Sequence, residues 1–382
     1  MQEDHDVQNR YLSGLSELLR AIGGILYRDR WIWLGVVVAL LVGEVALRWV
    51  RPELAGQVYS AGMTGGHPIF LSKEGFRVTQ NGQATGGKTI IAHGDSTTFG
   101  TGVGAEETWP LVLDKMLGEE VSVRNGGLQG VGLEGFPTLL DNAIQAGKPP
   151  AAVVLLVTPN MVSATDFHWG EESINLRARA HRFQLLPHNR LKQKLSELVQ
   201  SSALWKAVTL NVQYGKFAIG LSDHRVDPRR PISPLMAYGW VQPDLEEDAH
   251  ERMWQRFQSA LKGLQALIYD QGGCFMIGYL PPRFMLSENR LDNLKFVPRE
   301  RLVEDAENRV QELAGELGIP FVKTSELLRD VRNAKGSFSP PLYVPGDYTH
   351  PDAKGHAFVA EGFASAMLPT SDSRQVCSIF RM

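Results

Sequence analysis

The feature that most restricts the fold is a run of six apolar residues without a polar position, Ala152-Val153-Val154-Leu155-Leu156-Val157. A strand with one face in water alternates apolar and polar side chains, so this run predicts a strand buried on both faces. Four shorter runs predict further strands at 89–93, 121–123, 274–279 and 320–322. Helical spacing predicts helices over 108–117, 139–146, 246–269, 301–317 and 352–367. Strands that alternate with helices indicate an α/β fold with a flavodoxin-like, doubly wound, parallel five-stranded sheet.

A second apolar run, residues 31–50, precedes this pattern. Twenty residues at about 1.5 Å each match the roughly 30 Å hydrocarbon core, which predicts one transmembrane helix. Trp31 and Trp49 stand where interfacial anchors are expected, while Glu44 is unfavourable in lipid. A buried amphipathic helix is the alternative. More arginines precede the run than follow it, so we expect a single-pass membrane protein with an extracytoplasmic main domain.

Composition divides the 382 residues into five parts. A polar lead is followed by the anchor, a stalk rich in Gly, Pro, Ser and Thr, the main domain, and a polar tail. A stretch without clear strands within the main domain predicts a mostly helical insertion. The predicted bounds are 1–30, 31–50, 51–86, 87–370 and 371–382, with the insertion at about 163–245.

The charge pattern excludes some partners. The formal net charge is −3 and no basic cluster occurs, so nucleic acid is not an expected partner. Cys274 and Cys377 are the only cysteines, and the chain has no CxxC or HxxxH motif, so we expect neither a metal nor a cofactor. Whether the two cysteines form a disulfide stays open.

Polar groups occur where the predicted strands end, which is where parallel sheets carry their reactive residues. Serine is a good nucleophile only when an oriented base accepts its proton. Ser96 follows a strand at a Gly-flanked turn, and Asp347 and His350 lie three residues apart before the last helix. These three residues form the predicted catalytic triad. Ser96 as a helix N-cap is the alternative.

The sequence resembles the SGNH (GDSL-like) hydrolase superfamily, as a membrane-anchored member of bacterial type. The resemblance is carried by Gly94-Asp95-Ser96 through Gly100, by Asn125 to Gly130, by Asn160 and by Asp347 to Pro351. It implies an oxyanion hole made by the backbone N–H groups of Ser96 and Gly130 and the amide of Asn160. The third motif departs from the family, because Thr158 and Met161 replace its Gly and Asp. Gly130 as a turn residue and Asn160 as a loop cap are the alternatives.

A D-x-H-W string, Asp166-Phe167-His168-Trp169, resembles the catalytic pair of alginate-acetylating relatives. In those proteins the pair precedes the serine motif, whereas here it follows. Asp166, His168 and Trp169 are therefore candidate substrate contacts, with His168 as the competing base.

The predicted function is an extracytoplasmic serine esterase that hydrolyses acyl esters, plausibly O-acetyl esters of a cell-surface glycan. The expected partners are an acylated small molecule or glycan and, through residues 31–50, a membrane. Two alternatives stay open: an O-acyltransferase, which resolves the same intermediate with a sugar hydroxyl, and a degenerate domain that only binds glycan.

Overall fold

The computed structural model describes most of the main domain and several shorter parts of the chain. They are residues 30–50, 58–72, 74–83, 87–130, 132–145, 147, 149–164, 202–205, 207–208, 211–212, 239–241, 246–282, 304–324, 342–344, 347 and 349–367. The predicted lead up to residue 29, the tail and most of the insertion lie outside these residues. Their predicted bounds therefore stay predictions.

One mixed sheet of eight strands runs through the described part of the chain, in the order β1-β2-β3-β5-β4-β6-β7-β8. Five of the strands are parallel, and their relative order is that of a flavodoxin-like sheet. They coincide with the five predicted strands: β4 (Lys88–Gly94), β5 (Val121–Gly127), β6 (Ala152–Val157), β7 (Cys274–Tyr279) and β8 (Phe321–Lys323).

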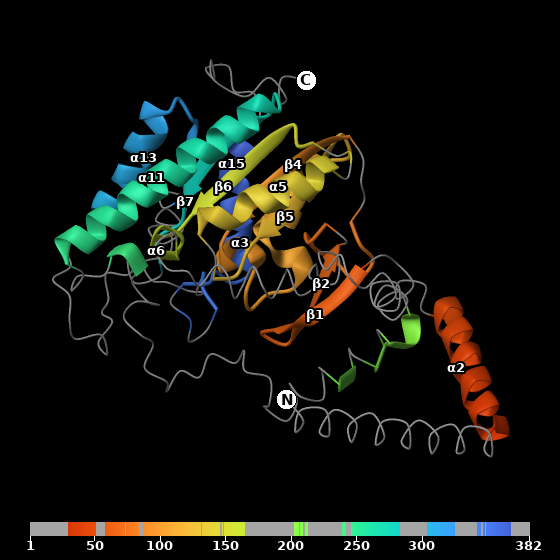
Figure 1. The fold of residues 1–382 in the computed structure, drawn as a ribbon. Coiled ribbons are helices and arrows are strands. Elements are labelled where there is room, and N and C mark those ends of the chain that lie inside the picture. The colour runs from red at the N-terminus through yellow and green to blue at the C-terminus, as the bar shows by residue number, and fades with distance from the viewer. Residues whose placement is uncertain are drawn as a thin grey trace, which may run out of the picture.

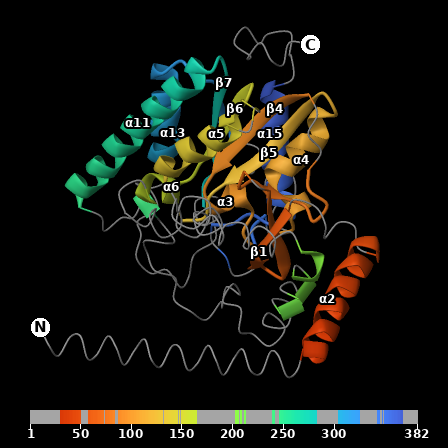
Figure 2. The same cartoon turned by 45° about the vertical axis from the view of Figure 1, so that its right-hand side comes forward.

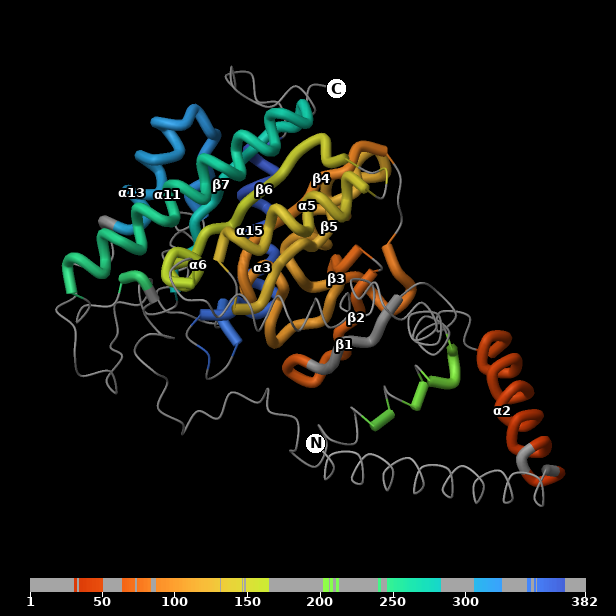
Figure 3. Tube along the Cα trace, in the orientation of Figure 1, coloured from red at the N-terminus to blue at the C-terminus, as the bar shows by residue number. Residues whose placement is uncertain are grey.

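The predicted total of five strands was too small, and the predicted stalk is partly sheet. β1 (Val58–Thr64), β2 (His67–Ser72) and β3 (Arg77–Val78) add to the edge of β5 as antiparallel strands, which can be followed in Figure 3. Gly65 and Gly66 join β1 to β2 with φ of 53° and 90°. Two residues with positive φ make the tight turn that a two-residue hairpin requires. These two glycines, which contributed to the stalk prediction, therefore form the turn of a hairpin.

Helices cover both faces of the parallel strands (Figures 1 and 2). One face packs against α5 (Phe136–Gln145), α11 (Glu247–Asp270) and α13 (Glu304–Glu316). The other face packs against α4 (Trp109–Leu117) and α15 (Ala353–Met367). Short elements complete the described chain: α3 (Ser96–Phe99), η2 (Ala105–Glu107), η3 (Leu133–Gly135), α6 (Pro159–Ala164) and η4 (Gly239–Val241).

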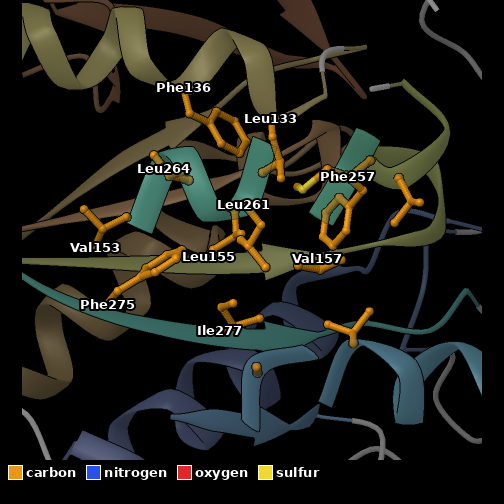
Figure 4. Close-up of a cluster of buried hydrophobic side chains, with 14 of the residues drawn as sticks. Leu133, Phe136, Val153, Leu155, Val157, Phe257, Leu261, Leu264, Phe275 and Ile277 are labelled. Carbon is orange, nitrogen blue, oxygen red and sulfur yellow. The ribbon is translucent and has the colours of Figure 1, made fainter. Parts of the chain in front are cut away.

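The fully apolar run in β6 serves both layers, as its lack of alternation predicted. Val153, Leu155 and Val157 join the cluster with α5, α11 and α13, whereas the intervening residues join the cluster with α4 and α15. Figure 4 shows the first cluster, in which Phe257 and Leu261 of α11 lie over β6. The strand is therefore buried on both faces.

The predicted helix over residues 31–50 is present as α2 (Arg30–Val50), which lies to one side of the sheet (Figures 1 and 2). Among the described residues, no helix is long and apolar enough to pass through a membrane. The transmembrane assignment is therefore not supported. Glu44 points instead at residues far along the chain, since its carboxylate accepts hydrogen bonds from Ser202 Oγ at 2.7 Å and from the backbone N–H groups of Ala203 and Leu204, each at 2.9 Å.

Cys274, the first residue of β7, is disulfide-bonded. The only other cysteine of the chain, Cys377, lies outside the described residues.

Candidate active site

Ser96 is placed by the sharp change of direction at the end of β4. Gly94 ends the strand, Asp95 follows, and Ser96 is the first residue of α3. Asp95 is the N-cap, because its Oδ1 accepts a hydrogen bond from the backbone N–H of Thr97 at 2.8 Å. Ser96 is therefore not the cap that the alternative interpretation required. Its hydroxyl points at His350 instead of the helix backbone.

The three predicted triad residues meet in space. His350 Nε2 lies 2.8 Å from Ser96 Oγ, and His350 Nδ1 lies 2.6 Å from Asp347 Oδ2. Ser96 and His350 are 254 residues apart in sequence. A hydroxyl, an imidazole and a carboxylate thus form one hydrogen-bonded chain, in the order that the sequence predicted. An arrangement of this kind makes serine nucleophilic in serine hydrolases, and the catalytic roles of the three residues stay a prediction here.

Asp347 is held by its own turn. Its Oδ1 accepts hydrogen bonds from the backbone N–H groups of Thr349 at 2.8 Å and His350 at 3.1 Å. The remaining oxygen, Oδ2, is then free to face the imidazole. The backbone O of His350 accepts a hydrogen bond from Val344 N–H at 3.0 Å, which fixes the turn against the rest of the domain.

The electrostatics of the pair favour a charged imidazole beside a charged carboxylate. Burial alone would raise the pKa of Asp347, but the charge and hydrogen bonds of His350 and a hydrogen bond from Thr349 lower it to about 2. Burial alone would lower the pKa of His350, but Asp347, and to a smaller extent the charge of Asp95, raise it above its usual value. Asp347 therefore stays ionised at neutral pH and stabilises the imidazolium that forms when His350 takes a proton.

Gly130 lies on the loop after β5, is exposed, and has a φ of 65°. Two contacts tie this loop to the nucleophile segment. Leu128 N–H donates to Gly94 O at 2.8 Å, and Gln129 Nε2 donates to Thr101 Oγ1 at 2.9 Å. The loop that carries Gly130 is thus fixed at the same sheet edge as Ser96, and its positive φ suits glycine.

Asn160 lies in the first turn of α6, directly after β6, and is half-buried. Thr158, which replaces the family glycine, donates its hydroxyl to Asp95 Oδ2 at 2.5 Å. Asp95 therefore joins the nucleophile turn to the segment that carries Asn160. This contact could not be predicted from sequence, because a threonine at a position where the motif is not kept does not indicate its partner. The oxyanion roles of Gly130 and Asn160 stay predictions.

The other histidines near the site are structural. His93 stacks on Phe136, with ring centroids 4.5 Å apart. His356 is fully buried in α15 and its Nδ1 accepts the backbone N–H of Trp109 at 3.2 Å. Burial and the nearby charges of Arg77 and His350 lower the pKa of His356 to about 3, so it is neutral.

Two further points concern possible ligands. Asp166, His168 and Trp169 lie outside the described residues, so their role as candidate substrate contacts stays a prediction. Within the described ranges, no three His, Cys, Asp or Glu side chains group as metal ligands would.

Comparisons with known proteins give similarities at the level of solved structures. No protein-family model and no curated protein matches this chain. A G-D-S-L family protein from Desulfitobacterium hafniense DCB-2 is 14% identical, with a TM-score of 0.38, over 73% of this chain and 98% of that chain. A catalytic mutant of Axe2, an acetylxylan esterase from Geobacillus stearothermophilus, is 15% identical, with a TM-score of 0.38, over 74% of this chain and 95% of that chain. LAE5, an alpha/beta hydrolase enzyme from the metagenome of Lake Arreo, Spain, is 14% identical, with a TM-score of 0.38, over the same shares. These TM-scores are low, so the interpretation of the site rests on its geometry. The solved structures to which this chain is similar thus include an esterase and a member of the G-D-S-L family.

Proposed function

We propose that this protein is a serine esterase that cleaves acyl esters through an acyl-enzyme on Ser96. The observation that carries the proposal is the unbroken chain of two short contacts, 2.8 Å from Ser96 Oγ to His350 Nε2 and 2.6 Å from His350 Nδ1 to Asp347 Oδ2. Packing alone has no need for a buried carboxylate, an imidazole and a hydroxyl in this order at a sheet edge.

In the first half-reaction, Ser96 Oγ attacks the ester carbonyl carbon while His350 Nε2 accepts the hydroxyl proton. Asp347 holds the remaining N–H on Nδ1, so that the unprotonated nitrogen faces the serine. The carbonyl oxygen becomes an oxyanion. When the tetrahedral intermediate collapses, the ester C–O bond breaks and His350 returns its proton to the leaving alcohol.

In the second half-reaction, His350 accepts a proton from water, whose oxygen attacks the acyl-serine carbonyl. Collapse releases the carboxylic acid and restores the Ser96 hydroxyl. We propose that the oxyanion in both steps accepts hydrogen bonds from the backbone N–H groups of Ser96 and Gly130 and from the side-chain amide of Asn160. Each such donor contributes about 3–4 kcal/mol of transition-state stabilisation in serine hydrolases.

Hydrolysis of p-nitrophenyl acetate and labelling by a fluorophosphonate probe test the proposal in the purified full chain. We expect both in the wild type and neither in Ser96→Ala. Ser122→Ala, which alters a buried serine of β5 instead, should keep both. Wild-type protein that is folded yet unlabelled and inactive on short-chain esters contradicts the esterase assignment.

The identity of the base is tested separately. His350→Ala should abolish turnover, whereas His168→Ala should retain a turnover number within a few-fold of the wild type. The reverse result would transfer the base role to the Asp166–His168 pair.

We further propose that the domain works outside the cytoplasm and that α2 attaches it to a membrane. Two observations support this. Cys274 is disulfide-bonded, and disulfides persist mainly in oxidising compartments. Apolar side chains are exposed along α2, including Trp31 and Trp49 near its two ends, at 71% and 86%. Large exposed apolar surfaces often mark membrane contact, and tryptophan favours the interface. An enzyme in this place meets surface glycans, so O-acetyl esters of such glycans are the proposed substrates.

Cell fractionation tests the location. The full chain should sediment with membranes, and a variant lacking residues 31–50 should not. Protease added to intact spheroplasts or cells with a permeabilised outer layer should degrade the domain. A full chain found in the soluble cytoplasmic fraction would refute both parts of this proposal.

A further inference from the structure

Arg77 is a fully buried cation that lies behind the nucleophile turn. It belongs to β3, in the N-terminal part of the sheet, and its exposed fraction is 0%. Its Nη1 donates to the carbonyl oxygens of Phe99 at 2.5 Å and Gly100 at 2.6 Å. Its Nη2 donates to the carbonyl oxygen of Val103 at 2.7 Å, and the guanidinium lies over the Phe99 ring, 4.9 Å from its centroid. The side chain thus binds one short segment at three places.

That segment is the continuation of the helix that begins with Ser96. α3 has four residues, and the carbonyl groups at the end of a helix have no partner within it. The carbonyl oxygen of Ser96 accepts the N–H groups of Gly100 at 3.0 Å and Thr101 at 3.1 Å. Arg77 binds the carbonyls of residues that follow, those of Phe99, Gly100 and Val103. The backbone after the nucleophile is therefore held both by its own hydrogen bonds and by the guanidinium.

The free-energy cost of burying the charge of Arg77 indicates that its hydrogen bonds to this segment are specific. A buried cation is unfavourable unless hydrogen bonds or an opposite charge compensate it. In the described part of the chain, no carboxylate lies within ion-pair distance of Arg77, and burial lowers its pKa only to about 10, so it is charged at neutral pH. Its compensation comes from the three carbonyl oxygens and, at longer range, from the charge of Glu107, which raises the pKa of Arg77 against the effect of burial. An apolar side chain would fill the same space without this desolvation cost, but it would remove the short hydrogen bonds to all three oxygens. Only the longer contacts from Asn125 Nδ2 to Phe99 O at 3.4 Å and from Val103 N–H to Gly100 O at 3.3 Å would remain.

We propose that Arg77 is a positioning residue for the nucleophile, which clamps the Phe99–Val103 segment so that Ser96 Oγ stays within hydrogen-bonding distance of His350. The proposal rests on the esterase function proposed above and deepens it. It gives the N-terminal antiparallel strands a part in catalysis, since β3 carries the clamp. Loss of the clamp displaces the attacking hydroxyl, which slows the chemical step, while the surfaces that bind the substrate stay in place.

Arg77→Met tests the clamp, because methionine keeps much of the packing and has no donors. We expect kcat for p-nitrophenyl acetate to fall by about 10- to 100-fold, with KM changed less than about twofold, because small displacements of a reacting group have effects of this size. Arg77→Lys should recover part of kcat, since one ammonium group can serve some of the carbonyls. The matched control is Arg124→Met, which removes a second buried arginine, 5.5 Å from the Phe76 ring, on β5. It should keep kcat within about twofold.

Hydrogen–deuterium exchange gives a readout that does not depend on activity. The Gly100 and Thr101 amides, which donate to Ser96 O, should exchange at least tenfold faster in Arg77→Met and at the wild-type rate in Arg124→Met. If Arg77→Met fails to fold, the same comparison is made with Arg77→Lys. Faster exchange of these amides in Arg77→Met but not in Arg124→Met, together with a wild type that has no esterase activity, would refute the proposed function but uphold the clamp. Unchanged exchange with kcat within twofold, or a rise in KM at constant kcat, would overturn the clamp.

Discussion

Replacing Asp347 by asparagine changes one oxygen to an amide and removes the charge that faces the imidazole. In the wild type, Oδ2 accepts the Nδ1 proton at 2.6 Å, which leaves Nε2 as the acceptor for Ser96. An amide can instead present its NH₂ group to Nδ1. The imidazole then carries its proton on Nε2, where it faces the serine hydroxyl and can no longer accept from it. Asp347→Asn therefore disables the base while the fold is kept.

The size of the effect follows from the charges. Imidazolium and carboxylate charge centres about 4 Å apart attract each other by about 4 kcal/mol at an effective dielectric constant of about 20. Each 1.36 kcal/mol is about tenfold in rate, so losing this term slows the reaction about 10³-fold. The unfavourable tautomer adds to this. We expect kcat to fall by about 10³- to 10⁴-fold, with KM changed by less than a few-fold.

The pH profile separates this mechanism from general damage. His350 must be neutral to act as base, and its pKa is raised above 6.5, so wild-type kcat/KM should rise through an apparent pKa above that value. In Asp347→Asn the main raising influence is gone and burial remains, so the residual activity should titrate at lower pH. Asp352→Asn is the control, because Asp352 caps α15 through the N–H groups of Lys354 and Gly355 and should leave kcat unchanged. A folded Asp347→Asn variant with kcat within tenfold of the wild type, or with an unshifted profile, would refute the reasoning.

Three further predictions concern stability. Gly127→Ala should destabilise the fold by at least about 1–3 kcal/mol and reduce activity, because its Cβ would lie 2.0 Å from the backbone N of Phe99. Gly315→Ala is the control, because its Cβ meets nothing within 4 Å, and it should be neutral or stabilising. Urea unfolding measures both variants. The folded pKa of His356 is about 3, below its usual 6.5, so the unfolded chain takes up a proton first as pH falls. The contribution of His356 to the unfolding free energy should therefore drop by roughly 2 kcal/mol between pH 7 and pH 5, and His356→Gln should remove this contribution from the pH dependence. Cys274→Ser should lower the unfolding free energy by roughly 2–4 kcal/mol and abolish the effect of dithiothreitol on Tm. A wild-type Tm that dithiothreitol does not change would contradict this prediction.

Much of the fold could be predicted from sequence because the central strands are buried on both sides. The unbroken run 152–157 and its shorter counterparts leave few alternatives, and all five parallel strands are where they were predicted. The N-terminal strands were missed for a physical reason. Glycine pairs occur both in flexible segments and in tight hairpins, and at Gly65-Gly66 only the paired strands decide between the two.

The triad could be predicted because each of its residues lies in a short local motif beside a predicted strand end or helix start. Arg77 and Thr158 could not. Each acts through one long-range contact, to the Phe99–Val103 carbonyls and to Asp95, and a single arginine or threonine in a sequence does not specify its partner. Likewise, the D-x-H-W string cannot be assigned by pattern alone, since its order relative to the serine motif differs from that of the relatives it resembles.

The separation of 254 residues between Ser96 and His350 also sets the order in which the site forms during synthesis. Translation at about 5–20 residues per second puts roughly 10–50 s between the two side chains. Throughout that interval the serine is an ordinary alcohol. His350 lies on the turn before α15, and α15 packs against α4, where His356 Nδ1 accepts a hydrogen bond from Trp109 N–H. The base is therefore held in place only after α15 has packed. We therefore expect the nascent chain to be chemically inert toward esters until its last helix has left the ribosome.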